Sequence, residues 1–152
     1  MASNRHLGRI IALQTLYEFE FRRDAGDQNV NLDEILTRNL ERYKDTVEDK
    51  SFVQKLVHGV AEQSQALDET IQPIAPEWPL QQVARIDRVI LRQALFELRD
   101  MQDLVPPKVA INEAVELAKA FGSDNSSKFV NGVLGTAYRT LIEGNTNANT
   151  KV

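Results

Sequence analysis

Residues 85–100, RIDRVILRQALFELRD, form the most apolar segment of this 152-residue sequence. At the spacing of an α-helix, the apolar residues of the segment occupy nearly every side: Ile86, Val89, Ile90, Leu91, Ala94, Leu95, Phe96 and Leu98. A helix that is apolar all round is buried among other helices. The segment therefore predicts a central helix that forms the core of the second half of the chain.

Proline-rich segments flank this central helix. Upstream, QPIAPEWP (72–79) carries three prolines, which remove amide donors and clash with the preceding turn. The segment therefore predicts the end of a helix over 50–71 and a hinge between two halves of the chain. Pro79 suits the first position of a short helix that reaches Val83. Downstream, VPPK (105–108) separates the central helix from a helix expected over 109–121.

Helical spacing also dominates the first half of the chain. The helix expected over 4–22 is apolar on two sides, so it should pack against two neighbours. Asn31 is expected to cap a second helix, with Glu34 reaching back as in a capping box. Signals for strands are almost absent. The sequence therefore predicts an all-α protein of about six or seven helices.

The length and the apolar content of 42% suit one compact domain that needs neither disulfides nor metal. We expect a single helical domain over 1–143, with an N-terminal half at 4–72 and a C-terminal half at 79–142. The polar residues 144–152 have no periodicity and predict a disordered tail.

The composition excludes several classes of function. The chain has no cysteine, and its two histidines lie in separate helices without a catalytic or metal-binding motif, so we expect no enzyme, cofactor or metal site. No segment is apolar enough for a signal peptide or a membrane span, which predicts a cytoplasmic protein. The formal charge of −4 means that any contact with nucleic acid must be local.

The segment FGSDNSSKFVNGVLG (121–135) interrupts the helical pattern with a polar loop. Gly122 is expected to end one helix in the left-handed conformation, and Ser123 or Asp124 to cap a last helix that runs to about residue 142. Glycine inside a helix costs stability, so Gly132 and Gly135 need another reason. Either a neighbouring helix or the backbone of a partner comes close to them.

Two short stretches carry groups that suit single-stranded nucleic acid. At the start of the last helix, backbone amides and Lys128 can meet phosphates, and Phe129 can stack on a base. Phe129 lies at the edge of the apolar stripe, so a place in the core is the alternative. Near the N-terminus, Arg5 and Arg9 share one helix face and can bridge phosphates, or they are ordinary surface arginines.

Four segments together resemble the NusB family of bacterial transcription antitermination factors. They are IALQTLYEFE, VHGVAE, IDRVILRQALFEL and, most specific of all, VPPKVAINEAVELAKAFGSDNSSKFVNGVLG (105–135). The similarity runs from about residue 5 to 141. It implies an all-α protein of two helical subdomains packed across each other, without catalytic activity.

The resemblance also implies partners and contact residues. Family members bind boxA-type RNA of ribosomal RNA leaders together with NusE, a small-subunit ribosomal protein, and help to load an antitermination assembly on RNA polymerase. The RNA contacts carried over by this similarity fall on Arg5, His6, Arg9, Asn125, Ser126, Lys128 and Phe129. The NusE-binding surface implied in the same way comprises Tyr17 and Asp87, with Glu18 and Arg88 as neighbours.

Other interpretations stay open at this point. Tyr17 also suits a core aromatic, and Asp87 a favourable charge at a helix start. The family commonly has more arginines at its N-terminus, and some relatives place an aromatic residue where this chain has Ile74.

Some relatives form homodimers, which this chain could share. An RNA-binding domain of a ribosomal RNA methyltransferase and a protein-only scaffold are alternative functions, although the polar tail favours a stand-alone factor.

Overall fold

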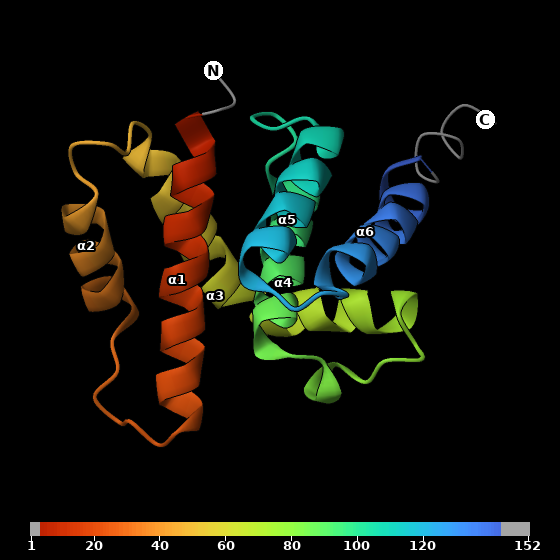
Figure 1. The fold of residues 1–152 in the computed structure, drawn as a ribbon, viewed down its shortest axis with the longest axis horizontal. Helices are drawn as coiled ribbons and strands as arrows, with labels where there is room; N and C mark the ends of the chain where they lie inside the picture. Colours follow the sequence, from red (N-terminus) through yellow and green to blue (C-terminus); the bar gives the residue numbers. More distant parts are fainter. Residues whose placement is uncertain (1–3, 144–152) are drawn as a thin grey trace. The chain divides into compact units, whose positions relative to one another are not determined.

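The computed structural model describes residues 4–143, and every regular element among them is a helix (Figure 1). A 3-10 helix, η1 (Leu80–Gln82), precedes the fourth α-helix, and a π-helical segment, η2 (Tyr138–Glu143), continues the last one. The expected all-α class is confirmed, whereas the expected tail lies outside the described residues. The α-helices are α1 (Asn4–Asp24), α2 (Leu32–Arg42), α3 (Lys50–Ile74), α4 (Arg85–Asp100), α5 (Pro107–Phe121) and α6 (Ser126–Ala137).

The chain divides into two compact units, unit 1 (Met1–Glu62) and unit 2 (Gln63–Val152). The division falls inside α3, whereas the sequence placed the boundary between the two halves at 72–79. The helix α3 also ends at Ile74 instead of Ile71. Pro73 is tolerated because it lies in the last turn, where a missing amide costs a single hydrogen bond. The amide of Ala75, the residue after the helix, still donates to the Ile71 carbonyl at 3.1 Å.

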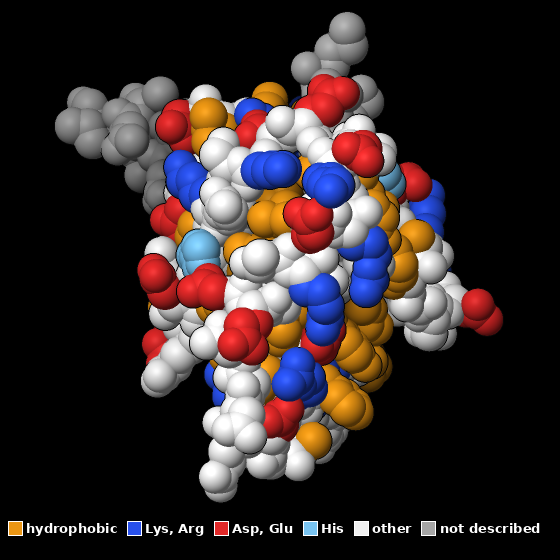
Figure 2. Space-filling model, turned by 90° about the vertical axis from the view of Figure 1, so that its left-hand side faces the viewer, with side chains coloured by type: hydrophobic (Ala, Val, Ile, Leu, Met, Phe, Trp, Pro, Cys, Tyr) orange, Lys and Arg blue, Asp and Glu red, His pale blue; other side chains and the backbone are white. Residues whose placement is uncertain are grey.

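Within unit 1, α1 packs against α2 around a buried polar contact. The Asn39 side-chain amide donates to Thr15 Oγ1 at 2.9 Å, and both residues are buried. The Asn31 cap is confirmed, since its side chain accepts the Glu34 amide at 3.0 Å. On the face that α2 covers, acidic and basic side chains are interspersed (Figure 2). That face therefore presents no large area of a single charge.

Asp49 caps the start of α3. Its Oδ1 accepts the Ser51 hydroxyl at 2.8 Å and the Phe52 amide at 3.0 Å. These two hydrogen bonds, with a smaller contribution from Arg5, lower the pKa of the Asp49 carboxyl below its usual value. The charged carboxylate therefore stabilises unit 1.

Replacing Asp49 by alanine is expected to lower the free energy of unfolding by about 0.5–2 kcal/mol near neutral pH, because the cap is lost. Because the folded-state pKa is lowered, the contribution of the charge is complete above the ordinary value of 3.8 and is lost as the pH falls through the folded-state value. Asp49→Asn keeps a capping oxygen, so it should lower the free energy of unfolding by less than Asp49→Ala does. It should also make the free energy of unfolding depend less on pH at acidic pH. Urea unfolding over a pH series measures both effects. Wild-type stability of Asp49→Ala at neutral pH would contradict the capping role.

Within unit 2, α4 packs against both α5 and α6, and α5 packs against α6. The expected central helix is thus confirmed as α4. The helix α5 begins two residues earlier than expected, because Pro107 fits the first turn, where its missing amide has no partner to lose. The apolar side chains that α4 buries are Val89, Ile90, Leu91, Ala94, Leu95, Phe96 and Leu98.

Candidate nucleic-acid interface

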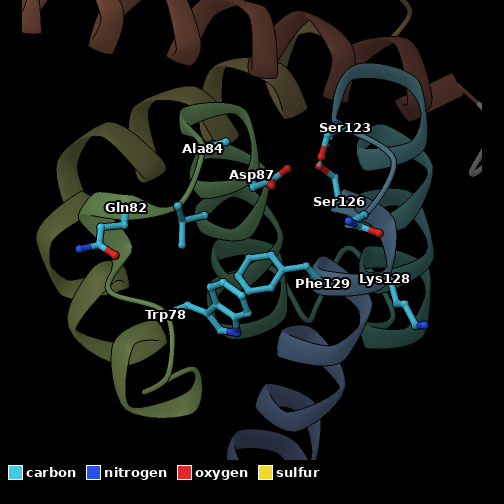
Figure 3. Close-up of a pocket in the computed structure, with 10 residues that line it drawn as sticks. Trp78, Gln82, Ala84, Asp87, Ser123, Ser126, Lys128 and Phe129 are labelled. Atoms are coloured by element: carbon cyan, nitrogen blue, oxygen red, sulfur yellow. Dashed lines mark hydrogen bonds between the residues drawn. The ribbon is translucent and has the colours of Figure 1, made fainter.

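A pocket of about 520 Å³ opens in unit 2 beside the start of α6 (Figure 3). Its walls come from the segment before α4, from the first turn of α4 and from the loop and first turn of α6. The volume lies within the range of sites that hold small organic groups. The pocket is therefore large enough for a flat ring such as a nucleobase.

Two aromatic rings stand at this pocket. Trp78 and Phe129 meet edge to face, with ring centres 6.0 Å apart and planes at 76°. Trp78 is 57% exposed, whereas Phe129 is half-buried. A second hollow of about 280 Å³ shares both rings and Lys128 with the first. Each hollow thus offers an aromatic surface next to a cationic side chain.

Hydrogen bonds between Ser123 and Ser126 stabilise the turn before α6. The Ser123 amide donates to Ser126 Oγ at 2.9 Å, and the Ser126 amide donates to the Ser123 carbonyl at 3.1 Å. Gly122 makes room for this arrangement, because a Cβ at that position would overlap Ser126 Oγ. The predicted left-handed conformation of Gly122 is wrong, since its φ of −91° and ψ of −170° are extended.

The predicted cap of α6 is also wrong. The residue at the cap position is Asn125, not Ser123 or Asp124, and its side chain makes no capping hydrogen bond. Ser126 is buried and its hydroxyl is occupied by Ser123. Ser126 therefore shapes the turn, whereas Asn125 and Lys128 are exposed beside it.

The glycines of α6 do not serve close helix packing. A Cβ at Gly132 would meet no atom within 4 Å, and one at Gly135 would meet only the end of the Arg139 side chain at 3.6 Å. The prediction that a neighbouring helix comes close is therefore wrong. Gly132 instead lines the smaller hollow, so a partner's backbone there remains the other interpretation.

Gln72, on the last turn of α3, holds the loop that carries Trp78. Its side-chain nitrogen donates to the carbonyls of Ala75 at 3.2 Å and Trp78 at 3.1 Å. Its side-chain oxygen accepts the Leu80 amide at 2.9 Å. One side chain therefore fixes both ends of the loop and the position of the tryptophan between them.

Replacing Gln72 by alanine is expected to loosen this loop without unfolding unit 2. The Leu80 amide loses its acceptor, so its hydrogen exchange should accelerate about two- to tenfold, as expected for one net hydrogen bond. Gln65→Ala is the matched control, because Gln65 is on the same helix and its amide reaches only Glu69. Unchanged exchange of Leu80 in Gln72→Ala, measured by NMR, would show that the loop does not depend on this side chain.

The arginines near the N-terminus do not form the expected open pair. Arg9 is only 1% exposed, so its expected position on the surface is wrong. Its guanidinium lies 5.1 Å from the centre of the Phe52 ring, and that of Arg5 lies 4.9 Å from the same centre. Arg5 also lies 3.5 Å from the Asp49 carboxylate, while His6 is exposed. Contact with the Phe52 ring thus accounts for the buried position of Arg9. The role of Arg5, His6 and Arg9 in RNA binding stays a prediction.

The expected partner residues of α1 lie beside an exposed aromatic side chain. Tyr17 stacks on Phe21, with ring centres 6.3 Å apart, and Phe21 is 52% exposed. Glu18 pairs with Arg38 on α2 and with Arg22 at 3.0 Å. The hydrogen bond from Arg38, with help from Arg22, lowers the pKa of the Glu18 carboxyl despite its partial desolvation. Glu18 is therefore ionised and joins α1 to α2.

Asp87 and Arg88, the other expected partner residues, lie in the first turn of α4 in unit 2. Asp87 is 8% exposed and lines the same pocket as Phe129. Arg88 Nη1 donates to the Leu80 carbonyl at 3.4 Å. Asp87 is thus brought together with the RNA-binding candidates, and Arg88 helps to hold the loop next to them.

Sequence reasoning missed Trp78 and Gln72. The sequence did contain a signal for Trp78. A large aromatic residue between Pro76 and Pro79 is expected outside the helices, where an exposed ring indicates a binding role. Gln72 carries no such signal, since its role depends on the path of the loop.

Other kinds of site find no support in residues 4–143. No three side chains of the His, Cys, Asp and Glu types gather there as metal ligands would. None of the helices in that range is long and apolar enough to cross a membrane.

Comparison with known proteins identifies the family. Residues 6–139 match the model of the NusB family. The transcription antitermination protein NusB of Roseiflexus castenholzii is 50% identical over 148 residues, which cover 95% of this chain and all of that protein. The structure of T. maritima NusB is 35% identical with a TM-score of 0.74, covering 86% of this chain and 87% of that one. A structure of the antitermination factors NusB and NusE with double-stranded RNA shares the fold, at 23% identity and a TM-score of 0.77 over 92% of this chain and 99% of that one. The chain therefore belongs to the NusB family.

Proposed function

We propose that this protein is a transcription antitermination factor that binds boxA-type single-stranded RNA of ribosomal RNA leaders together with a NusE-type ribosomal protein. The pair would join an assembly on RNA polymerase and promote its processivity, which places the protein in the cytoplasm. Membership of the NusB family supports the role, and relatives bear the name of a transcription antitermination protein. The observation that carries the RNA contact is the exposed Trp78 ring against Phe129 at the start of α6.

Single-stranded RNA suits the pocket for three reasons. Unpaired bases stack on aromatic side chains, and two rings are available here. Lys128 borders both hollows and can meet a phosphate between two successive bases. Gly132 leaves open space at the smaller hollow, so a strand can lie close to α6.

The residues near the N-terminus would add contacts of a second kind. Arg5 and His6 offer donors to phosphates, and buried Arg9 would act by supporting Phe52 under Arg5. Few cations are involved in a chain of net charge −4. RNA affinity should therefore fall only gently as salt rises.

The partner protein would bind α1. Half-buried Tyr17 and exposed Phe21 supply a stacked aromatic pair, and aromatic residues are enriched at the centre of protein interfaces. Glu18, which is ion-paired with Arg22 and Arg38, holds these two guanidinium groups beside the pair.

The test measures binding of a fluorescently labelled boxA-type RNA, alone and with the NusE-type protein. We expect specific binding that strengthens when the partner is present, and weaker binding of a scrambled RNA of the same composition. A chain that binds the partner but never RNA would instead be a protein-only scaffold. Dimerisation at the RNA surface would appear in sedimentation as dissociation when RNA is added.

A further inference from the structure

Gly132 lies at an exposed position in the interior of α6, where glycine weakens a helix. A Cβ at this position would meet no atom within 4 Å, so packing among residues 4–143 does not require a glycine there. Gly135, three residues later, also has room for a Cβ. The two glycines differ because Gly132 lines the smaller hollow of about 280 Å³, whereas Gly135 lines neither hollow. The missing side chain at residue 132 therefore keeps the smaller hollow open.

The walls of the smaller hollow favour one part of a nucleotide. Glu77 borders this hollow but not the larger one, and its carboxylate disfavours a phosphate inside it. A ribose bears hydroxyl groups, whereas the faces of a base are flat and apolar, so a base loses least when it leaves water for apolar walls. The apolar side chains that line the hollow are Ile74, Ala75, Pro76, Trp78, Phe129 and Val133.

The two aromatic rings divide the smaller hollow from the larger one. Figure 3 shows the Trp78 and Phe129 rings against each other on one side of the larger hollow, and both rings also line the smaller one. The ring planes stand at 76° to each other, so one flat base cannot lie parallel to both. Two bases, one in each hollow, can each lie against one ring. Lys128 borders both hollows and can meet the phosphate that joins the two nucleotides.

We propose that the smaller hollow binds a second nucleobase, next in the strand to the base in the larger hollow, and that Gly132 is the residue that admits it. A larger side chain at residue 132 would occupy the space of this base. Glycine at this position therefore serves RNA binding at the expense of helix stability. The inference rests on the proposed RNA binding and adds to it a base subsite with the residue that controls access.

The test uses the variants Gly132→Leu and Gly132→Ala, with Gly135→Ala as the matched control on the same helix. Each variant replaces a glycine inside α6 by a better helix former, so each should melt about 2–4 °C higher than the wild-type protein. A loss of RNA binding in a variant that melts higher cannot be a loss of folding. If the leucine variant melts below the wild type, the alanine variant alone decides the outcome.

The probes are labelled boxA-type RNAs in which one nucleotide at a time lacks its base. For the wild-type protein we expect two neighbouring positions at which the abasic nucleotide weakens binding by about fivefold to a hundredfold each, as loss of a stacked base predicts. Gly132→Leu should weaken binding of the intact RNA by a similar factor, and one of the two positions should become insensitive to removal of its base. Gly132→Ala should show a smaller loss. Gly135→Ala should keep the wild-type affinity and both sensitive positions.

Four results would overturn the inference. If Gly132→Leu keeps the wild-type affinity and pattern of sensitive positions, the smaller hollow holds no base, and the proposed function still stands. If Gly132→Leu weakens binding while every abasic position keeps its effect, the strand passes the hollow with its backbone. If Gly132→Leu loses affinity for the NusE-type protein but not for RNA, the hollow belongs to the protein partner. If no RNA binds to the wild-type protein even with the partner, the proposed function fails and the inference fails with it.

Discussion

Alanine in place of Phe129 is expected to weaken binding of single-stranded RNA by about fivefold to a hundredfold, as loss of one stacked base predicts. The ring is half-buried and meets Trp78 edge to face, so its removal also frees the tryptophan. Both effects remove aromatic surface from the two hollows that share these rings. Fluorescence anisotropy of labelled RNA measures the loss, and circular dichroism measures the helical content.

The matched control for this substitution is Phe121→Ala. Phe121 is an exposed phenylalanine at the end of α5 and lines neither hollow. Its replacement should leave RNA affinity unchanged. If Phe129→Ala unfolds the protein while each folded molecule keeps its RNA affinity, the ring belongs to the core and does not bind RNA.

Alanine in place of Leu95 is expected to lower the free energy of unfolding by about 2–5 kcal/mol. Leu95 is 0% exposed at the middle of α4, which packs against α5 and α6. The substitution removes apolar surface and leaves a cavity that the surrounding helices cannot fill. Urea denaturation followed by circular dichroism gives the change.

The control for the core is Leu104→Ala, because Leu104 is exposed in the connection between α4 and α5. It should change stability by no more than about 0.5 kcal/mol. If Leu95→Ala were as mild as Leu104→Ala, α4 would not be the central helix of unit 2.

The helices of this protein could be predicted because the spacing of apolar residues along the sequence shows which side of each helix is buried. The predicted segment 85–100 coincides with α4, since apolar residues on every side leave no alternative to a central position. Helix ends were less predictable. Gly122 was expected to be left-handed, but the contact that decides its conformation is the side chain of Ser126, four residues later.

In the candidate site, only those residues could be predicted whose type alone indicates a binding role. Lys128 and Phe129 next to a helix start suggested RNA, and both line the pocket. The position of Arg9 was predicted wrongly. Arginines usually lie at the surface, but the guanidinium of Arg9 makes a favourable buried contact with the Phe52 ring. The position of Trp78 follows from three hydrogen bonds of Gln72, which no local pattern encodes.

The emission of Trp78 tests the proposed binding surface most directly, because it is the single tryptophan of the chain. We predict that titration with boxA-type single-stranded RNA quenches this fluorescence, and that the quenching saturates at the same RNA concentration as the anisotropy of labelled RNA. RNA that binds by anisotropy while the emission of Trp78 stays unchanged would contradict the account, because the strand would then lie away from the two rings.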